Sequence, residues 1–408
     1  MDQRVRRWLE PPNVPRTHYV DNRIYTDAGL FAREQEAILG RCWRFVCHES
    51  ELPHPGDYRV TDVAGHPIIV VRGKNDIIRS FYNVCAHRGA PIVRDERGHV
   101  EGDFQCLYHL WTYGLDGQCT GITRPEGYMG VGLEASSLSL RPVRTQTLFG
   151  LVFANLDDEA EPLEEFLGGM VDHLREHLSE AAFEVFHYHR AEMKCNWKLF
   201  ADNDGEQYHE FLHILNRETG IIHPEYHNRR WKLYPNSHNI MMQGVLHYDS
   251  FGLDKRGENT LPGMLPDGFV VMLLFPDVMI NIRATVMRID RMIPIDPGRT
   301  LVEWRGLGLA NDTDELRDMR RRHHNQVWGP AGRNLPEDTI AVEAQWANMD
   351  RGAMPFSLFA REEDLRPQDD ENLRAFYQEW GRRIGCDPSD PFGERPEGQV
   401  SRRSAAGE

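Results

Sequence analysis

Between residues 43 and 155 the hydrophobic and polar positions follow one another in short runs, which is the pattern of β-strands. Glycine, asparagine and aspartate separate these runs, as antiparallel hairpins require. We therefore expect a small antiparallel β domain over residues 43–155. A lead-in segment, residues 1–42, precedes it and is expected to contain a short helix at 32–39 and to pack on the second domain. The strands expected are Tyr58–Val60, His66–Val71, Ile77–Tyr82 and Leu151–Ala154.

After residue 156 the apolar positions change to helical spacing. Apolar residues fall on one face of a helix predicted over 163–178. Helices then mix with strands of one antiparallel sheet, which predicts an α+β domain over residues 156–390. Residues 391–408 are rich in Gly, Arg, Ser and Glu, so we expect a disordered tail. The expected helices are Trp197–Leu215, Glu315–Val327 and Asp370–Ile384, and the strands are Ile240–Tyr248, Phe269–Phe275, Met279–Met287 and Leu301–Leu309.

Composition excludes several classes of protein. The 408 residues carry a formal net charge of −16, which argues against a nucleic-acid or anionic-membrane partner. The longest apolar run, Phe269–Phe275, is too short to span a bilayer, and residues 1–20 lack the apolar core of a signal peptide. Cysteines outside the motifs described next are scattered and form no disulfide framework. A cytoplasmic protein is expected.

Two half-sites carry the most specific chemistry in the chain. Cys85 and His87 form C-x-H, and after eighteen residues Cys106 and His109 form C-x2-H. Two cysteines on one iron and two histidines on the other are the ligands of a Rieske [2Fe–2S] cluster. Neutral imidazoles remove negative charge, so this cluster accepts an electron more readily than an all-cysteine cluster. The motif predicts an electron-transfer protein.

A structural zinc site is the alternative for these four residues. Zinc sites usually group cysteine with cysteine and histidine with histidine, whereas each half-site here mixes the two. The segments 88–91 and 111–114 also resemble the loops that enclose Rieske clusters. The stretch between the half-sites is slightly long, and Leu110 stands where glycine commonly follows the last ligand. The Rieske cluster is favoured.

A second metal site is indicated further along the chain. His209 and His213 are four residues apart, so on a helix they would lie on one face and could bind one metal ion. Two histidines and one carboxylate, with positions left open, form the facial triad of mononuclear Fe(II) oxygenases. A candidate carboxylate lies in the segment 336–345.

From about Tyr25 to Gly385 the chain resembles the Rieske non-haem iron oxygenases, specifically the catalytic α subunits of aromatic-ring-hydroxylating dioxygenases. The resemblance rests on the two half-sites, on N-W-K at 196–198, and on an acidic residue shortly before Tyr-His and a second histidine. It implies a helix-grip type of catalytic domain and His209, His213 and Asp338 as ligands of a mononuclear Fe(II). It also implies that Glu206 is a bridging carboxylate.

The resemblance further implies how electrons move. They come from NAD(P)H through a separate reductase, with or without a ferredoxin, and enter the Rieske cluster. They then cross a subunit interface, from His109 (or His87) through Glu206 to His209 of the neighbour. A homotrimer, α3 or α3β3 with a small β subunit, is therefore expected. Tyr208 beside this route is expected to be a packing residue, and Asp202 and Asp204 are alternative bridges.

The implied reaction is O2-dependent hydroxylation or dihydroxylation of an aromatic, acidic substrate of the benzoate or phthalate type. Monooxygenation of a non-aromatic or sulfonated small molecule is the alternative. Arg283 could pair with an acid substrate, although a surface or structural role is favoured for it. The residues expected to line the pocket are Phe200, Leu212, Met241, Val245, Phe275 and Ile282.

Two alternatives from other classes stay open. Residues 209–213 read H-E-x-x-H, the signature of zinc metallopeptidases, with Glu210 as general base. A non-catalytic Rieske electron relay fused to a ligand-binding domain is the other. A peptidase has no use for the cluster half-sites, which favours the oxygenase. Structural roles are expected for the other histidines and a solvated helix face for the basic run, namely His187, His189, His227, His238 and His247, and Arg320–His324.

Overall fold

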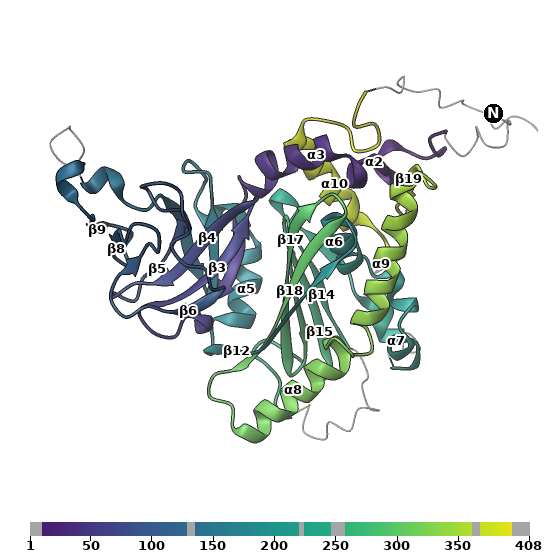
Figure 1. Ribbon diagram of the computed structural model, residues 1–408. Coiled ribbons are helices and arrows are strands. Elements are labelled where there is room, and N and C mark those ends of the chain that lie inside the picture. Colours follow the sequence, from purple (N-terminus) through teal and green to yellow (C-terminus); the bar gives the residue numbers. More distant parts are fainter. Residues whose placement is uncertain (1–9, 129–134, 220–223, 246–257, 361–367, 394–408) are drawn as a thin grey trace, which may run out of the picture.

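Two seven-stranded antiparallel sheets lie beside each other in the computed structural model, which describes residues 10–128, 135–219, 224–245, 258–360 and 368–393 (Figure 1). Helices pack mainly on the second sheet, on the side away from the first (Figure 1). The predicted α+β class is confirmed.

The first sheet has the strand order β2-β11-β10-β5-β4-β3-β6. The four strands predicted in this region are confirmed, with boundaries that differ by a few residues. A smaller sheet of three strands, β7-β8-β9, forms the tip of this domain. The bounds are β2 (Arg44–His48), β3 (Asp57–Val63), β4 (His66–Arg72), β5 (Ile78–Tyr82), β6 (Arg97–His99), β7 (Phe104–Gln105), β8 (Thr112–Tyr113), β9 (Cys119–Gly121), β10 (Pro142–Leu148) and β11 (Leu151–Asn155).

The second sheet has the order β12-β18-β17-β16-β15-β14-β13. The expected single strand Met279–Met287 is wrong, because the chain reverses at Ala284 and Thr285 and makes two strands. Ala284 adopts a φ of +45°, a turn conformation that a glycine or asparagine at this position would have predicted from the sequence. The strand β12 was not predicted. The bounds are β12 (Phe183–Met193), β13 (Trp231–Leu233), β14 (Asn239–Val245), β15 (Gly268–Leu274), β16 (Val278–Arg283), β17 (Val286–Asp296) and β18 (Arg299–Leu309).

The expected helices are present, but two of them are interrupted. The helix expected over 163–178 breaks at Gly168, whose φ of +53° suits glycine and ends α4. The helix expected over 197–215 ends at Gly205, and a short 3-10 turn leads into the next helix. A helix over Leu335–Asp350 was missed. The bounds are α2 (Arg23–Thr26), α3 (Ala28–Glu34) continued by the π-turn η2 (Gln35–Leu39), α4 (Leu163–Leu167), α5 (Met170–Leu178), α6 (Trp197–Gly205), η6 (Tyr208–Phe211), α7 (Ile214–Thr219), α8 (Asp314–Trp328), α9 (Leu335–Asp350) and α10 (Glu371–Ile384).

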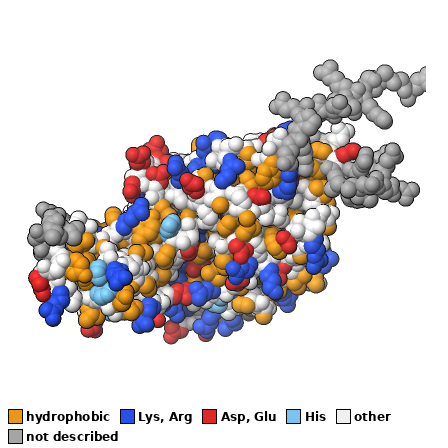
Figure 2. All heavy atoms as spheres, turned by 45° about the horizontal axis from the view of Figure 1, so that its top comes forward, with side chains coloured by type: hydrophobic (Ala, Val, Ile, Leu, Met, Phe, Trp, Pro, Cys, Tyr) orange, Lys and Arg blue, Asp and Glu red, His pale blue; other side chains and the backbone are white. Residues whose placement is uncertain are grey.

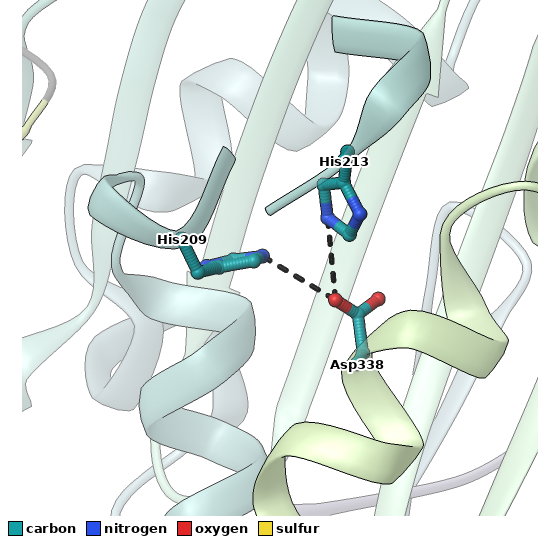
Figure 3. A group of neighbouring side chains, drawn as sticks. All are labelled: His209, His213 and Asp338. Atoms are coloured by element: carbon teal, nitrogen blue, oxygen red, sulfur yellow. Dashed lines mark ion pairs between the residues drawn. The ribbon is translucent and has the colours of Figure 1, made fainter. Parts of the chain in front are cut away.

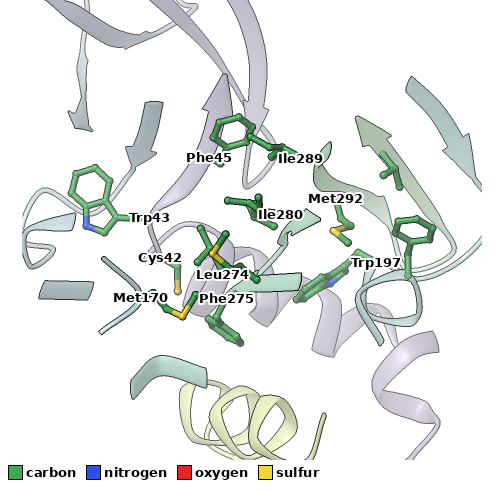
Figure 4. Packing of buried hydrophobic residues seen from close by; sticks show 14 of the residues in the cluster. Cys42, Trp43, Phe45, Met170, Trp197, Leu274, Phe275, Ile280, Ile289 and Met292 are labelled. Carbon is green, nitrogen blue, oxygen red and sulfur yellow. The ribbon is translucent and has the colours of Figure 1, made fainter. Parts of the chain in front are cut away.

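The two faces of the second sheet have different chemistry. Alternate residues of β16, Ile280 and Ile282, point into a large hydrophobic core that also contains Phe45 from the first sheet (Figure 4). Asn281 and Arg283 point to the opposite face, toward the helices. One face therefore joins the two domains, and the other is free to build a site.

The segment before the first sheet lies against the second domain, because β1 (Tyr19–Asp21) pairs with β19 (Phe356–Leu358). Most of the tail expected to be disordered, 394–408, lies outside the described residues. Among the residues that are described, no helix is both long and apolar enough to cross a membrane.

Candidate metal centres and the cavity beside them

The predicted cluster ligands lie together at the tip of the first domain. Cys85 and Cys106 are 3% and 1% exposed, and the rings of His87 and His109 lie with their centroids 4.5 Å apart. Buried sulfur with two adjacent imidazoles nearer the surface is the arrangement that a Rieske cluster needs. The hydroxyl of Tyr113 lies 3.1 Å from Sγ of Cys85. A hydrogen bond to a cluster sulfur withdraws electron density and raises the reduction potential.

His87 and His109 differ in their surroundings. The ring of His87 stacks on Trp111 at 4.6 Å, and its Nε2 lies 3.0 Å from the hydroxyl of Tyr128. Its Nδ1 is buried and has no hydrogen-bond partner among the described residues, so this nitrogen is the one available to iron. The donor set therefore fits a [2Fe–2S] cluster. Because Tyr128 engages Nε2 of His87, His109 is the better candidate to face an acceptor outside the chain.

Leu110, directly after the last cluster ligand, is in the left-handed conformation with a φ of +61°. Its amide donates to the carbonyl of Cys106 at 3.0 Å and so closes the ligand loop. A side chain at positive φ is strained, whereas glycine is not. Leu110, which stands where glycine commonly follows the last cluster ligand, is therefore a strained residue.

The three predicted ligands of the mononuclear site converge (Figure 3). His209, His213 and Asp338 each offer one ligand atom, and these atoms lie within 4.8 Å of one another. Oδ1 of Asp338 is 3.6 Å from Nε2 of His209 and 3.2 Å from Nε2 of His213. This oxygen is buried and has no hydrogen bond among the described residues. Two imidazoles and one carboxylate that share a point in this way fit Fe(II).

Carboxylates hold the far nitrogen of each imidazole. Nδ1 of His209 lies 2.9 Å from Oε1 of Glu206, and Nδ1 of His213 lies 2.7 Å from Oε2 of Glu337. Such contacts fix the tautomer and turn Nε2 toward the metal. Burial lowers the pKa of His209, but Glu206, Asp338 and Glu210 outweigh it and raise the pKa to about 10. The site therefore attracts a cation at Nε2.

The local fold explains why two histidines four residues apart can meet without a regular helix. The helix α6 begins at the Asn196 cap, whose side chain accepts from the amide of Lys198, and ends at Gly205. The carboxylate of Glu206 then accepts from the amide of His209 at 2.9 Å and so fixes the η6 turn. Asp338 comes from the first turn of α9. The expected common helix face for the histidines is therefore wrong, although they do converge.

Glu210 takes no part in this convergence. It is 4% exposed and makes two contacts with Arg229, at 3.2 and 2.8 Å. A metallopeptidase needs this glutamate beside the metal-bound water. The peptidase alternative fails because a buried arginine holds the carboxylate that would be its general base.

The alternative bridging carboxylates are also engaged elsewhere. Asp202 accepts hydrogen bonds from the hydroxyls of Tyr25 and Tyr377, at 2.9 and 2.7 Å. Asp204 lies 3.6 Å from Arg288, with its side chain 8% exposed. Glu206 and Asp202 both line a depression that also includes Tyr208 and His209, but only Glu206 contacts Nδ1 of His209. Tyr208 is 63% exposed, so it does not pack inside this chain as expected.

A polar cavity adjoins the three candidate metal ligands. Two arginines, Arg283 and Arg288, form part of its wall and are each 4% exposed. The apolar part of the lining comes from Phe269, Val271, Met279 and Trp328. The amides that line it are Asn203, Gln207, Asn216, Asn281 and Asn334.

None of the six residues expected to line the pocket lines this cavity. Phe200, Phe275 and Ile282 belong to the large core, and Met241 belongs to a smaller hydrophobic cluster. Leu212 lines the depression that contains Glu206. Val245 ends β14 and is absent from the lining. The expectation selected hydrophobic residues, whereas the cavity is polar.

Several other expectations can be compared with the structure. His238 is structural, since Nε2 lies 3.0 Å from the carbonyl of Phe166 and Nδ1 accepts from the amide of Phe275. His187 and His189 contact each other at 2.9 Å, His227 packs on Tyr226, and His247 lies outside the described residues. The solvated face expected for Arg320–His324 is wrong in part. Of its five residues three are buried, namely Arg320, His323 and His324.

Sequence reasoning missed the residues that support the ligands. Glu337 was adjacent to the predicted Asp338, and a carboxylate one position before a ligand could have been weighed as its partner. The side-chain amide nitrogen of Asn203 lies 3.0 Å from Nε2 of His209, and no sequence motif predicts this contact. Tyr113 reaches the cluster ligands from β8 and Tyr128 from the residue after a 3-10 turn, and the sequence does not reveal either approach.

Comparison with known proteins agrees with both halves of this description. The Rieske [2Fe-2S] domain family matches residues 42–134, and the ring hydroxylating alpha subunit (catalytic domain) family matches residues 180–385. The chain is 42% identical over 385 residues to 2-aminobenzenesulfonate 2,3-dioxygenase subunit alpha from Alcaligenes sp., covering 94% of this chain and 98% of that protein. It is 37% identical to methanesulfonate monooxygenase hydroxylase subunit alpha from Methylosulfonomonas methylovora, covering 94% and 95%.

Solved structures share the fold. Naphthalene 1,2-dioxygenase from Rhodococcus sp. superimposes with a TM-score of 0.77 at 22% identity, covering 90% of this chain and 94% of that one. The chain thus belongs to the Rieske-type oxygenase α subunits, an oxidoreductase family with a Rieske cluster and a mononuclear iron.

Proposed function

We propose that this protein is the terminal oxygenase of a multicomponent system and that it oxygenates a small organic sulfonate. The observation that carries the proposal is the position of the three candidate iron ligands, His209, His213 and Asp338, on the wall of a cavity whose lining also includes two buried arginines. Iron bound there supplies O2 activation when electrons arrive from the Rieske cluster. The protein's own residues hold the metal, bind the substrate and deliver electrons.

Electron delivery is proposed to cross between subunits. The loops that carry the cluster ligands, beside β8 and β9, lie at the opposite end of the molecule from α7 and α9 at the iron site (Figure 1). Histidine and hydrophobic side chains lie together on the surface at the cluster end (Figure 2). Leu107, Tyr108 and Leu110 there are each more than 50% exposed. Exposed apolar patches of this kind mark protein interfaces.

A second set of exposed apolar residues follows Glu206 in the sequence, and two of them, Tyr208 and Leu212, line the same depression as Glu206. Tyr208, Phe211, Leu212 and Ile214 are exposed by 63, 45, 41 and 55%. Docking of the cluster tip of one subunit on this surface of the next would place His109 against Glu206, whose Oε1 already contacts His209 at 2.9 Å. Contacts of this head-to-tail type form a closed ring when the rotation between neighbouring subunits closes, and a ring of three subunits is proposed here. A separate reductase is proposed to supply the electrons, with NAD(P)H as their source.

The substrate class rests on charge and on the relatives. Two relatives over nearly the full length act on sulfonates, one aromatic and one aliphatic, as their names state. The arginines and amides of the cavity suit an anionic group, and Phe269 and Trp328 suit an aromatic ring. An aromatic sulfonate is therefore proposed before an aliphatic one. This replaces the benzoate- or phthalate-type acid expected from the resemblance.

The test is a substrate panel with a compatible reductase, NADH and O2. Benzenesulfonate, 2-aminobenzenesulfonate, methanesulfonate, benzoate and benzamide are compared by O2 uptake and by product, so that uncoupled reduction of O2 is recognised. We expect product from an aromatic sulfonate, with one O2 consumed per product. Product from the neutral or carboxylate compounds alone would show that the proposed class is wrong.

A further inference from the structure

Arg283 occupies a distinct place on the wall of the cavity. It lies at the end of β16, is 4% exposed, and shares the cavity lining with all three candidate iron ligands. Its guanidinium carbon is 5.1 Å from the ring centroid of Phe269 and 5.1 Å from that of Trp328. Aromatic faces stabilise a buried guanidinium while its N–H groups point sideways. The side chain is thus held beside the space where substrate is expected.

Three buried amides surround the same space from different elements. Asn216 from α7, Asn281 from β16 and Asn334 before α9 are exposed by 2, 6 and 4%. The Oδ1 atom of each is buried without a hydrogen-bond partner among the described residues. Buried amides are ordinarily satisfied, so these three oxygens around one cavity are sites at which a bound ligand can complete the hydrogen bonding. An amide that turns about its last bond presents its NH2 group instead.

Asn281 and Arg283 belong to one wall. They are two residues apart on a strand, so their side chains leave the sheet on the same face. Phe269 pairs directly with Arg283 on the neighbouring strand, and Val271 pairs with Asn281. The polar groups of β16 therefore stand beside apolar groups of β15, as a substrate with an anionic head and an apolar body requires.

The carboxylates of the lining are matched by cations. Glu210 is paired with Arg229 at 2.8 Å, and Asp338 faces the two histidines. Arg288 lies 2.6 Å from Asp290 and 3.6 Å from Asp204. Burial raises the pKa of Asp204 and raises that of Asp290 to about 6, so this pair tends to retain a proton. Arg288 is therefore largely neutralised by its own partners.

We propose that Arg283, with the amides of Asn216, Asn281 and Asn334, forms the subsite that binds the sulfonate group of the substrate. The guanidinium fork engages two sulfonate oxygens and the amides engage the rest. The carbon skeleton then extends along Phe269 toward His209, His213 and Asp338. Arg283 determines specificity and is not a metal ligand. This inference rests on the proposed function for the identity of the anion.

The experiment measures binding, so it does not depend on turnover. Calorimetric titration of the oxidised, iron-replete holoenzyme uses benzenesulfonate and its neutral analogue benzenesulfonamide. Arg283→Met should weaken benzenesulfonate binding by about 100-fold or more, because a buried anion loses charged hydrogen bonds. Binding of benzenesulfonamide should change by less than about threefold. The matched control is Arg322→Met, the same change at an exposed arginine on α8.

Two further variants protect the test against a folding defect. Arg283→Lys keeps the charge but loses the fork, so an intermediate loss is expected. Asn281→Asp keeps Arg283 but adds a negative charge to the subsite, and it should weaken benzenesulfonate binding more than benzenesulfonamide binding. The visible spectrum of the cluster and the iron content verify that each variant is folded.

The outcomes separate the inference from the function on which it rests. Turnover of benzenesulfonate by the wild type, with binding to Arg283→Met within threefold of wild type, overturns the subsite alone. Arg283-dependent binding of a sulfonate that the wild type never oxygenates supports the subsite and overturns the proposed function. A wild-type enzyme that binds no sulfonate overturns both.

Discussion

Glu337 holds Nδ1 of His213 at 2.7 Å, and the next residue, Asp338, places Oδ1 3.2 Å from Nε2 of the same ring. One turn of α9 therefore supplies both a candidate iron ligand and the carboxylate that orients a second candidate ligand. The arrangement parallels Glu206 and His209, where the contact is 2.9 Å. A carboxylate thus holds Nδ1 of each histidine and leaves Nε2 for a metal.

Replacing Glu337 should loosen the iron without removing a ligand. We expect Glu337→Gln to weaken Fe(II) affinity by about 10- to 100-fold, because His213 loses the partner that fixes its tautomer and orientation. Iron retained after dialysis against a graded chelator measures this. The control is Glu343→Gln on the same helix, where the side chain accepts a hydrogen bond from the amide of Lys194 at 2.9 Å. Equal iron retention in both variants would show that the contact is incidental.

Glu206 should matter for electron transfer more than for metal binding. Glu206→Gln keeps a hydrogen-bonding group near His209 but removes the charge, so in protein reloaded with iron to full occupancy the reoxidation of the reduced cluster should slow by at least about tenfold. Stopped-flow absorbance of the cluster after mixing with substrate and O2 gives the rate. Normal turnover by this variant would mean that the bridging role is wrong.

The direction of that transfer can be tested with mixed trimers. Co-expression of His109→Ala with His213→Ala joins subunits that lack a cluster ligand to subunits that lack an iron ligand. If electrons cross between chains, about a quarter of the interfaces in random trimers combine an intact cluster with an intact iron site, and activity returns. If transfer stays within one chain, the mixture is as inactive as its parents.

The sequence was most informative where chemistry demands fixed residues. The cluster half-sites and the pair His209 and His213 were predicted by spacing, because few residue types bind iron, and the structure brings the members of each set together. The cavity was not found, since its arginines and amides come from α6, the residue before η6, α7, β16, β17 and the residue before α9, which only the fold brings together. A search for hydrophobic lining residues selected residues on the core face of the sheet. Ile282, for example, belongs to the hydrophobic core, whereas its neighbour Arg283 lines the cavity on the opposite face.

Turns caused the other errors. Gly168 and Gly205 end helices that the apolar spacing alone would continue, and the reversal at Ala284 carries no glycine, asparagine or proline. The strand β17 was not predicted because it contains charged residues such as Arg288 and Asp290. These residues form a buried ion pair, but in the sequence they look like solvent-exposed positions.

Leu110 provides a stability test. Leu110→Gly should relieve the strain of a leucine at a φ of +61° and stabilise the cluster loop by up to about 1 kcal/mol. The rate at which the visible absorbance of the cluster decays on heating should fall. Leu107→Gly is the matched control, since Leu107 is similarly exposed (51% against 53%) and its φ is not positive. Faster decay in both variants would indicate that the leucine side chain stabilises the loop by contacts.

His238 predicts a dependence of stability on pH. Burial lowers the pKa of His238 to about 4, because the folded protein keeps the ring neutral between Phe166 and Phe275. Below pH 6.5 the unfolded chain binds a proton that the folded chain does not, so stability falls as the pH drops from 6.5 toward 4. The loss from this group between pH 7.5 and 5 should be about 2 kcal/mol.

Thermal or urea unfolding at the two pH values measures that loss, and His238→Gln removes the titrating group. We expect the variant to be less stable at pH 7.5 but to lose less stability on acidification than the wild type. An unchanged difference between pH 7.5 and 5 would assign the acid sensitivity to other groups.

The most direct test of the whole account is a single turnover without reductase. The holoenzyme is reduced chemically, freed of reductant, and mixed with O2 and the sulfonate selected by the substrate panel. We predict that product forms in proportion to the cluster electrons lost, and that His213→Ala retains a reducible cluster but forms no product. Product from His213→Ala at the wild-type yield would contradict the claim that cluster electrons act at the iron held by His209, His213 and Asp338.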